Sequence, residues 1–256
     1  MPGDSAVTIV DVHPDLLGTY GDGGNAVVLA RRLRWRGHEA SVHRAYSSKA
    51  VPAGAEIYCL GGGEDGPQST SVAALAEQGC LGRAVADGAV VLAVCAGFQI
   101  VGESFATSTG GVRPGLGLIG ARSIRGTGPR AVGELVVAPP PGTSLASVGL
   151  LSGYENHGGV TELDSDVTGL GAVLTGVGNG ADSRIDGAVV GRVVGTYLHG
   201  PVLARNPALA DHLLEWVVGP LGALDDTEML ALRAERLAAP SRPRPARPGR
   251  LRQRRR

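Results

Sequence analysis

The sequence contains little that would tie it to a disulfide framework, a metal or a membrane. Its three cysteines have neither metal-type spacing nor the pattern of a disulfide scaffold, which favours a reducing compartment. The longest uncharged apolar run around Cys95, residues 88–102, is shorter than the roughly 18 residues that a membrane span needs. Acidic residues interrupt the amino-terminal segment, so no secretory signal is recognisable. We therefore expect a cytoplasmic protein with no metal site.

Lysine is also scarce, and nucleotide-binding motifs are missing. Lys49 is the only lysine, and no Gly-x-x-x-x-Gly-Lys-[Ser/Thr] phosphate loop surrounds it. Any ATP-dependent step must then take place on another polypeptide. Glycine, by contrast, is abundant at 41 residues, which predicts many tight turns and close backbone approaches.

The net charge of zero hides an uneven distribution. Eight arginines and no acidic residue lie in residues 240–256, which leaves 16 basic against 24 acidic residues, about −8, for the rest. We expect a globular domain over 1–239 and a disordered arginine- and proline-rich tail over 240–256. One interpretation of the tail is a solvated segment with no specific role. The other is contact with anionic lipid at the inner face of the membrane. Nucleic-acid binding is less favoured, because the domain has no recognisable basic face.

Apolar, β-branched segments alternate with segments of helical spacing in the first part of the chain. Expected strands are 7–12, 40–43, 56–60 and 89–94, and expected helices are 26–36, 71–87 and 98–105. This alternation predicts βαβ units, and therefore an α/β fold with a mostly parallel central sheet flanked by helices.

After residue 110 the pattern changes to short β-rich segments between glycine and proline turns. These segments are 134–137, 172–174 and 189–194, and they predict additional antiparallel strands. A last helix is expected over 207–218, with Asn206 as its N-cap and proline at its first position.

Cys95 lies between the strand expected at 89–94 and a helix, and the small residues Ala96 and Gly97 follow it. This order is typical of a sharp turn that presents a nucleophile at the carboxyl edge of a sheet. The N-terminus of the helix favours a thiolate and can stabilise an oxyanion. The alternative is a buried core cysteine, but the surrounding sequence favours the nucleophile.

A cysteine nucleophile needs a base, and His199 is the best placed of the six histidines. It follows an apolar strand-like segment, so we expect it at the carboxyl end of a strand, where ligands of open α/β sheets bind. His13 and His157 lie in expected loops and are weaker candidates. The other three are expected to be solvent-exposed or structural, namely His38, His43 and His212.

Several motifs occur in the order found in a known enzyme family. Segments 61–63, 95–99, 153–159 and 197–200 resemble class I, triad-type glutamine amidotransferases, which have a flavodoxin-like fold, and within them the branch typified by cobyric acid synthase. Segment 14–25 is similar to the GatD group, the glutaminase subunits of lipid II isoglutaminyl synthases. The resemblance covers about residues 7–218.

The resemblance implies a reaction at Cys95. The sulfur would attack the side-chain amide of L-glutamine and form a γ-glutamyl thioester, while His199 moves the protons and ammonia leaves. The N–H groups of Gly62 or Gly63, together with that of Ala96, would stabilise the oxyanion. For the glycines the alternative is a tight turn with no further role.

Other residues acquire roles through the same resemblance. Arg130 matches the position at which the GatD group carries an arginine that holds substrate glutamine. The alternative is a solvated loop charge. Glu155 and His157 are expected to be structural. Asp22 and Asn25 either shape the pocket or a subunit contact or, as the default, form a turn.

One position departs from the family pattern. Many triad-type amidotransferases carry a glutamate two residues after the histidine, where it orients the imidazole, but this position is Pro201 here. The third member is therefore missing locally, and the resemblance implies that a partner subunit supplies it or that it is dispensable. A Cys–His pair without an orienting carboxylate should be a poor glutaminase on its own.

The resemblance also implies a partner. A Mur-ligase-like MurT subunit would form a heterodimer with this chain and would bind ATP and Mg²⁺, so this chain itself needs no cofactor. The complex would amidate D-glutamate of lipid II to D-isoglutamine in peptidoglycan biosynthesis. One alternative is another acceptor, such as a corrinoid. The other is a non-catalytic partner that keeps the fold, against which the joint presence of Cys95 and His199 argues.

Overall fold

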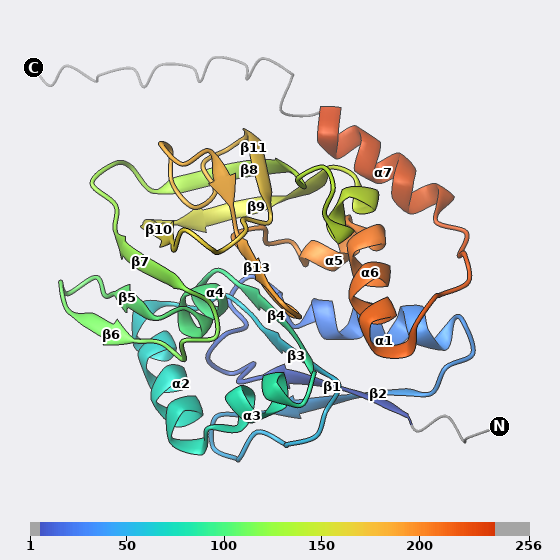
Figure 1. Ribbon diagram of the computed structural model, residues 1–256, viewed down its shortest axis with the longest axis horizontal. Coiled ribbons are helices and arrows are strands. Elements are labelled where there is room, and N and C mark those ends of the chain that lie inside the picture. Colours follow the sequence, from blue (N-terminus) through green and yellow to red (C-terminus); the bar gives the residue numbers. More distant parts are fainter. Residues whose placement is uncertain (1–5, 239–256) are drawn as a thin grey trace, which may run out of the picture.

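A six-stranded sheet forms the centre of the computed structural model, which describes residues 6–238 (Figure 1). Its strand order is β13-β14-β4-β3-β1-β2. Neighbouring strands are parallel, except that the edge strand β13 runs antiparallel to β14. The strands are β1 (Val7–Val12), β2 (Ala40–Ala45), β3 (Ile57–Leu60), β4 (Val90–Val94), β13 (Ala188–Val190) and β14 (Val193–Thr196). The expected α/β fold with a mostly parallel sheet is confirmed.

Helices cover both faces of this sheet. Every residue of β3 and β4 is buried, which explains why these strands are uninterrupted apolar runs. Because the β1–α1–β2 and β3–α2–β4 crossovers run toward opposite edges, right-handed connections place α1 and α2 on opposite faces. The helices are α1 (Gly24–Arg34), α2 (Asp65–Gln78), α3 (Cys80–Ala86), α4 (Ala96–Val101), α5 (Val202–Arg205), α6 (Pro207–Val218) and α7 (Thr227–Ala238), with a 3₁₀ helix at Ser144–Val148.

Two four-stranded sheets lie beside the central sheet (Figure 1). One has the order β10-β7-β5-β6 and contains a single parallel pair, β5 with β7. The other has the order β12-β11-β8-β9 and is antiparallel, so the expected antiparallel strands are present. The strands are β5 (Ser104–Ala106), β6 (Val112–Pro114), β7 (Ala121–Arg125), β8 (Ala131–Ala138), β9 (Leu151–His157), β10 (Gly159–Leu163), β11 (Gly171–Thr175) and β12 (Ile185–Asp186).

Most expected elements differ by a few residues at their ends, but three are divided or end early, and a glycine accounts for each. The helix expected over 71–87 is two helices, because Gly79 adopts φ +58° and ends α2. The helix expected over 98–105 is wrong beyond residue 101, since Gly102 has extended backbone and leads into β5. The strand expected over 189–194 is a hairpin that turns at Gly191, which has φ +55°.

The last helices also differ in part from expectation. Helix α6 begins at Pro207, but the side chain of Asn206 does not cap it. Instead, Asn206 Oδ1 accepts a hydrogen bond from Ser152 N (2.9 Å), and its Nδ2 donates to Ser152 O (2.8 Å). Helix α7 has no counterpart among the expected elements. The expected tail over 240–256 lies outside the described residues.

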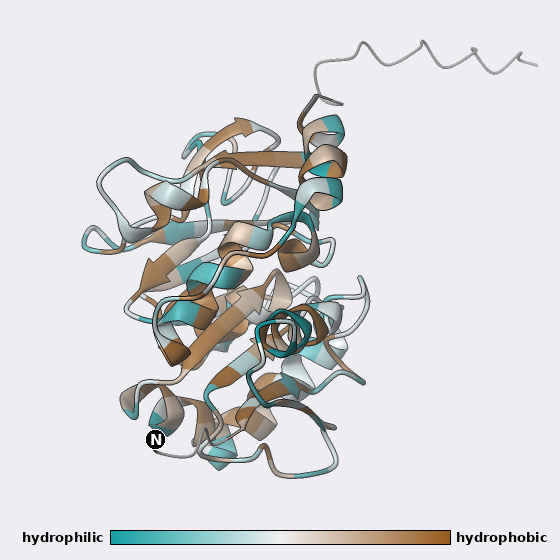
Figure 2. Ribbon diagram, turned by 90° about the vertical axis from the view of Figure 1, so that its right-hand side faces the viewer, coloured by the Kyte–Doolittle hydropathy of each residue, from teal (hydrophilic) through white to brown (hydrophobic). Residues whose placement is uncertain are grey.

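A buried ion-pair cluster joins the helices of one face. The guanidinium of Arg32 on α1 is 1% exposed and pairs with Asp211 on α6 (2.6 Å) and with Asp226 before α7 (2.7 Å). Figure 2 shows that hydrophobic residues otherwise concentrate in the strands. Among the helices within residues 6–238, none combines the length and the apolar character required to span a bilayer.

Candidate active site

Cys95 occupies a strained turn between β4 and α4. Its φ of +53° and ψ of −106° are rare for a residue other than glycine, and such strain is typical of functional positions. The backbone is held because Cys95 N donates to Thr196 O (2.8 Å) at the end of β14. Gly97 is required here, since a Cβ on it would lie 2.7 Å from Leu60 O. The local sequence therefore produces the expected presentation of the sulfur at the carboxyl edge of the sheet.

His199 follows β14, and its backbone is fixed by two hydrogen bonds. His199 N donates to Tyr154 O (2.8 Å), and Tyr154 N donates to His199 O (3.0 Å). The imidazole Nδ1 lies 2.8 Å from Asp22 Oδ2, and both side chains are at most 1% exposed. A carboxylate only accepts, so Nδ1 carries a proton. Nε2 is buried and has no hydrogen-bond partner among the described residues, so it remains available for proton transfer.

The pKa of His199 is raised to about 10. Burial alone lowers this pKa, but the hydrogen bond to Asp22 and the nearby Cys95 sulfur outweigh burial. The imidazole is therefore a cation at neutral pH. This positive charge lies close to the Cys95 sulfur.

Asp22 comes from the loop between β1 and α1, and the glycine loop after β3 lets it approach. A Cβ on Gly61 would overlap Leu17 O, and a Cβ on Gly63 would lie 2.6 Å from Leu16 O. In addition, Gly62 N donates to Asp22 Oδ2 (2.9 Å). The position two residues after His199 is indeed proline, but a partner subunit is not required to place a carboxylate against the imidazole, because Asp22 already does so. It lies in this chain, far from Pro201 in sequence.

The same hydrogen bond changes the assignment of oxyanion donors. The N–H of Gly62 is already used by Asp22, so it cannot also point at a substrate oxygen. The N–H groups of Gly63 and Ala96 donate to no other residue in the described part of the chain. They remain the two candidate donors.

A pocket of about 310 Å³ opens over the sulfur. Of the six predicted catalytic and substrate-binding residues, four line it, namely Cys95, Ala96, Gly63 and Arg130, and His157 lines it as well. Gly62 and His199 are not among its lining residues. Tyr20 does line the pocket, and its ring centroid is 4.5 Å from that of His199.

Tyr20 and Asn156 connect this pocket to Arg130, a link that the motif segments containing them do not reveal. Asn156 Nδ2 donates to the Tyr20 hydroxyl (3.0 Å). Arg130 Nε donates to Asn156 Oδ1 (2.5 Å), and its Nη2 donates to Asn156 O (3.0 Å). Residue type alone could not reveal this link, because the two loops and β9 meet only in the folded chain.

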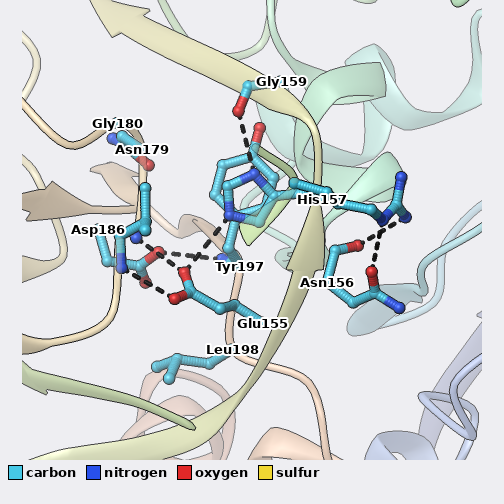
Figure 3. A network of polar contacts seen from close by, with 12 residues as sticks. Glu155, Asn156, His157, Gly159, Asn179, Gly180, Asp186, Tyr197 and Leu198 are labelled. Atoms are coloured by element: carbon cyan, nitrogen blue, oxygen red, sulfur yellow. Dashed lines mark hydrogen bonds and ion pairs between the residues drawn. The ribbon is translucent and has the colours of Figure 1, made fainter. Parts of the chain in front are cut away.

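A second polar network lies beneath the pocket (Figure 3). Glu155 accepts hydrogen bonds from Val177 N (2.8 Å) and Gly178 N (2.9 Å). The ring of His157 stacks on Tyr197 with a centroid distance of 3.9 Å. These contacts agree with structural roles for Glu155 and His157.

Asp186 anchors the other side of this network. Its Oδ2 accepts from Thr196 Oγ1 (2.6 Å) and its Oδ1 from Tyr197 N (3.2 Å). Burial raises the pKa of Asp186 to about 6, against the lowering effect of these hydrogen bonds. The network therefore fixes the strand end that leads into His199.

The pocket floor contains two glutamines in a defined orientation. Gln68 Nε2 donates to Gln99 Oε1 (2.9 Å), and Gln99 Nε2 donates to the Tyr197 hydroxyl (3.1 Å). Gln99 was part of the cysteine motif, whereas Gln68 was not recognised. A polar residue one helical turn inside α2 is too common a pattern to stand out.

The other two cysteines and the acidic residues form no second candidate catalytic or metal site in the described part of the chain. Cys59 and Cys80 are buried, and burial raises the pKa of both thiols. Over residues 6–238, His, Cys, Asp and Glu side chains form no group of three or more arranged to hold a metal ion.

The sequence and the fold of this chain are similar to those of known glutamine amidotransferases. Residues 8–207 match the model of the CobB/CobQ-like glutamine amidotransferase domain. A lipid II isoglutaminyl synthase (glutamine-hydrolyzing) subunit GatD of Staphylococcus aureus (strain N315) is 31% identical over 211 residues, which cover 82% of this chain and 83% of that protein. The GatD subunit of Streptococcus pneumoniae (strain ATCC BAA-255 / R6) is 30% identical, over 81% of this chain and 79% of that protein.

More distant similarities agree in fold. A cobyric acid synthase of Rhodobacter capsulatus is 36% identical over 160 residues, but these cover only 30% of that longer protein. The crystal structure of a glutamine amidotransferase from Thermotoga maritima has a TM-score of 0.52 at 13% identity and covers 93% of each chain. This last similarity concerns the fold alone.

Proposed function

Because this chain belongs to the family of CobB/CobQ-like glutamine amidotransferases, we propose that it hydrolyses L-glutamine through Cys95 and delivers the ammonia to a second subunit. The observation that carries the proposal is the arrangement at the pocket. A strained cysteine faces the substrate space, and a buried histidine is held on Nδ1 by Asp22 with Nε2 unpaired. This is the order nucleophile, base and orienting acid that acyl transfer requires.

Acyl transfer begins at the sulfur. The Cys95 thiolate forms a bond to the amide carbon of glutamine, and the carbon–nitrogen bond breaks as His199 Nε2–H protonates the departing nitrogen. Ammonia leaves, and a γ-glutamyl thioester remains on Cys95. His199, now neutral, removes a proton from water as the water oxygen attacks the thioester carbon. The carbon–sulfur bond breaks, and glutamate leaves while the thiolate is restored and the acid proton passes to solvent.

The remaining residues stabilise and orient the substrate. The N–H groups of Gly63 and Ala96 receive the negative charge that develops on the carbonyl oxygen. Arg130 binds the substrate through its guanidinium, which suits a carboxylate. Asp22 holds His199 in the tautomer that presents a proton at Nε2.

The similarity to GatD subunits supports a proposal for the acceptor of the ammonia. We assign the chain to a complex with a Mur-ligase-like MurT subunit, which binds ATP and Mg²⁺ and activates a carboxyl group of lipid II. The product is the D-isoglutamine of peptidoglycan. No cofactor is needed on this chain, because the thioester chemistry uses only its own side chains and water.

Two assays test this function in order. The first treats the chain with 6-diazo-5-oxo-L-norleucine, a glutamine analogue, and locates the adduct by mass spectrometry. We expect one adduct on Cys95, none in Cys95→Ser, and none on Cys59 or Cys80, which do not line the pocket. An unlabelled Cys95 would instead favour a non-catalytic subunit that keeps the fold.

The second assay identifies the acceptor. The chain is co-purified with a Mur-ligase-like protein and supplied with glutamine, ATP and lipid II. We expect glutamine-dependent amidation of lipid II that stops in Cys95→Ala and resumes when ammonium replaces glutamine. Amidation of a corrinoid but not of lipid II would assign the chain to the other branch of the family.

A further inference from the structure

The hydroxyl of Tyr20 has a proton for which the described chain offers no acceptor. Tyr20 lies in the loop between β1 and α1 and lines the pocket that contains Cys95. Its oxygen accepts a hydrogen bond from Asn156 Nδ2 at 3.0 Å. No bond in which this hydroxyl donates occurs within residues 6–238.

Arg130 determines which way the Asn156 amide faces, and hence the role of the hydroxyl. The Nε of an arginine can only donate, so the Asn156 atom at 2.5 Å from it must be the amide oxygen. The amide NH₂ group then faces Tyr20, and the tyrosine oxygen must accept. The O–H bond of Tyr20 therefore points away from Asn156.

Arg130 presents a second unused donor on the same side of the pocket. Its Nε and Nη2 both bind Asn156, whereas Nη1 has no acceptor among the described residues. The side chain is exposed and lines the pocket. Asn156 thus connects two donors, one neutral and one cationic, whose remaining protons are available to a ligand.

A ligand that satisfies both donors must present two acceptor oxygens with negative charge. Arginine pairs most strongly with carboxylate or phosphate, and a tyrosine hydroxyl adds a short charge-assisted bond. We propose that Tyr20 and Arg130 together bind the α-carboxylate of the substrate amino acid, so that Tyr20 determines specificity for glutamine. This inference rests on the proposed function and names one contact of the same site.

The position of Tyr20 also connects this recognition to the base. Its ring lies against the imidazole of His199, with a centroid distance of 4.5 Å and an interplanar angle of 52°. Gly62 closes the space behind both rings, because a Cβ there would lie 2.5 Å from His199 Cε1 and 3.1 Å from Tyr20 Cδ2. A carboxylate bound by the Tyr20 hydroxyl would hold the ring against His199 during proton transfer.

The test compares two substrates and two variants. L-Glutamine carries the α-carboxylate, whereas L-glutaminamide has a neutral carboxamide in its place. We expect Tyr20→Phe, which keeps the ring, to lower kcat/KM for glutamine by about 10- to 100-fold, mainly through KM, as for a lost hydrogen bond to a charged group. For glutaminamide we expect a change within about 2-fold, since a hydrogen bond to a neutral group contributes less. Tyr46→Phe, at a tyrosine that is 44% exposed and does not line the pocket, is the matched control and should leave both values unchanged.

The outcomes separate this inference from the function on which it rests. Equal losses of kcat/KM on both substrates would mean that the hydroxyl only supports His199, and would overturn the assignment, as would no loss on either. If wild-type protein forms the Cys95 adduct and hydrolyses glutamine while Tyr20→Phe behaves like wild type, the function stands and the inference fails. If wild-type protein, alone and with its partner, neither reacts with the analogue nor hydrolyses either substrate, both are refuted.

Discussion

Asp22 Oδ2 lies 2.8 Å from His199 Nδ1, although 177 residues separate the two in sequence. The same oxygen accepts the N–H of Gly62 at 2.9 Å. One carboxylate oxygen therefore ties together the loop after β1, the loop after β3 and the segment after β14. The orientation of the base depends on all three at once, and this dependence generates most of the following predictions.

Removing the charge of Asp22 should impair catalysis far more than folding. In Asp22→Asn we expect the glutaminase kcat to fall by about 10²- to 10⁴-fold, because an amide no longer enforces the tautomer with a proton on Nδ1. Steady-state ammonia release measures the effect. The control is Asp15→Asn in the same loop, where an exposed carboxylate binds Ser47 and no other side chain within residues 6–238. Near-wild-type activity of Asp22→Asn would show that another group orients His199.

The raised pKa of His199 predicts how activity depends on pH. Since this pKa is about 10, the imidazolium persists through neutral pH, and kcat/KM should decline only as the pH rises toward 10. Asp22→Asn removes the largest of the interactions that raise the pKa, so its alkaline limb should move to lower pH. An alkaline limb at the same pH in both proteins would contradict this assignment.

The same group links stability to pH. A pKa raised from 6.5 in the unfolded chain to about 10 in the folded chain means that the folded state binds the proton more tightly. This contribution is complete below pH 6.5 and disappears as the pH rises through 10. Urea unfolding at several pH values should therefore show the stability difference between wild type and Asp22→Asn shrinking across this window. A difference that stays constant from pH 6.5 to above 10 would argue against a charged pair.

Gly62→Ala should disable the site through shape alone. The added Cβ would lie 2.5 Å from His199 Cε1, so the imidazole must move away from its productive position. We expect at least a 100-fold loss of kcat, since small displacements of catalytic groups have effects of this size. Gly66→Ala in α2, where a Cβ meets nothing within 4 Å, should retain activity and gain up to about 1 kcal/mol of stability. Equal activities in the two variants would refute the steric argument.

Arg32→Met should affect stability without touching the chemistry. The variant leaves the partly buried Asp226 without its ion-pair partner and Asp211 with Arg36 alone, and breaking such a cluster costs about 3–5 kcal/mol. Denaturant unfolding measures the loss, while the activity per folded molecule should stay the same. Arg31→Met, at an exposed position on the same helix, is the comparison and should change stability by less than about 0.5 kcal/mol. A similar loss in both variants would mean that the ion pairs contribute nothing specific.

The sequence was sufficient for those parts of the site that depend on local order. Cys95 was recognisable because a buried strand, a nucleophile, small residues and a helix follow one another within about a dozen residues. His199 was recognisable because it follows a strand that belongs to the same sheet. In both cases the residues next to the functional side chain determine its position at a strand end. The two side chains then come close because β4 and β14 are neighbouring parallel strands.

The rest of the site could not be predicted, because it depends on contacts between distant loops. Asp22 looks like a turn residue until the glycines after β3 are seen to make room for its loop. Tyr20 and Asn156 lie within the motif segments 14–25 and 153–159, but only folding brings the two side chains together. The wrong helix boundaries at Gly79 and Gly102 have a local cause instead. At each position a single glycine ends the helix, although the helical spacing of apolar residues continues beyond it.

The distance in sequence between Asp22 and His199 has a consequence for how the protein is made. A ribosome adds about 5–20 residues per second, so the histidine is synthesised roughly 10 to 35 seconds after the acid that must receive it. Cys95 is synthesised within this interval, and from then until residue 199 the nascent chain contains its nucleophile but cannot align a proton donor with it. A half-made chain therefore consumes no cellular glutamine, and hydrolysis begins only once late and early segments have closed on each other.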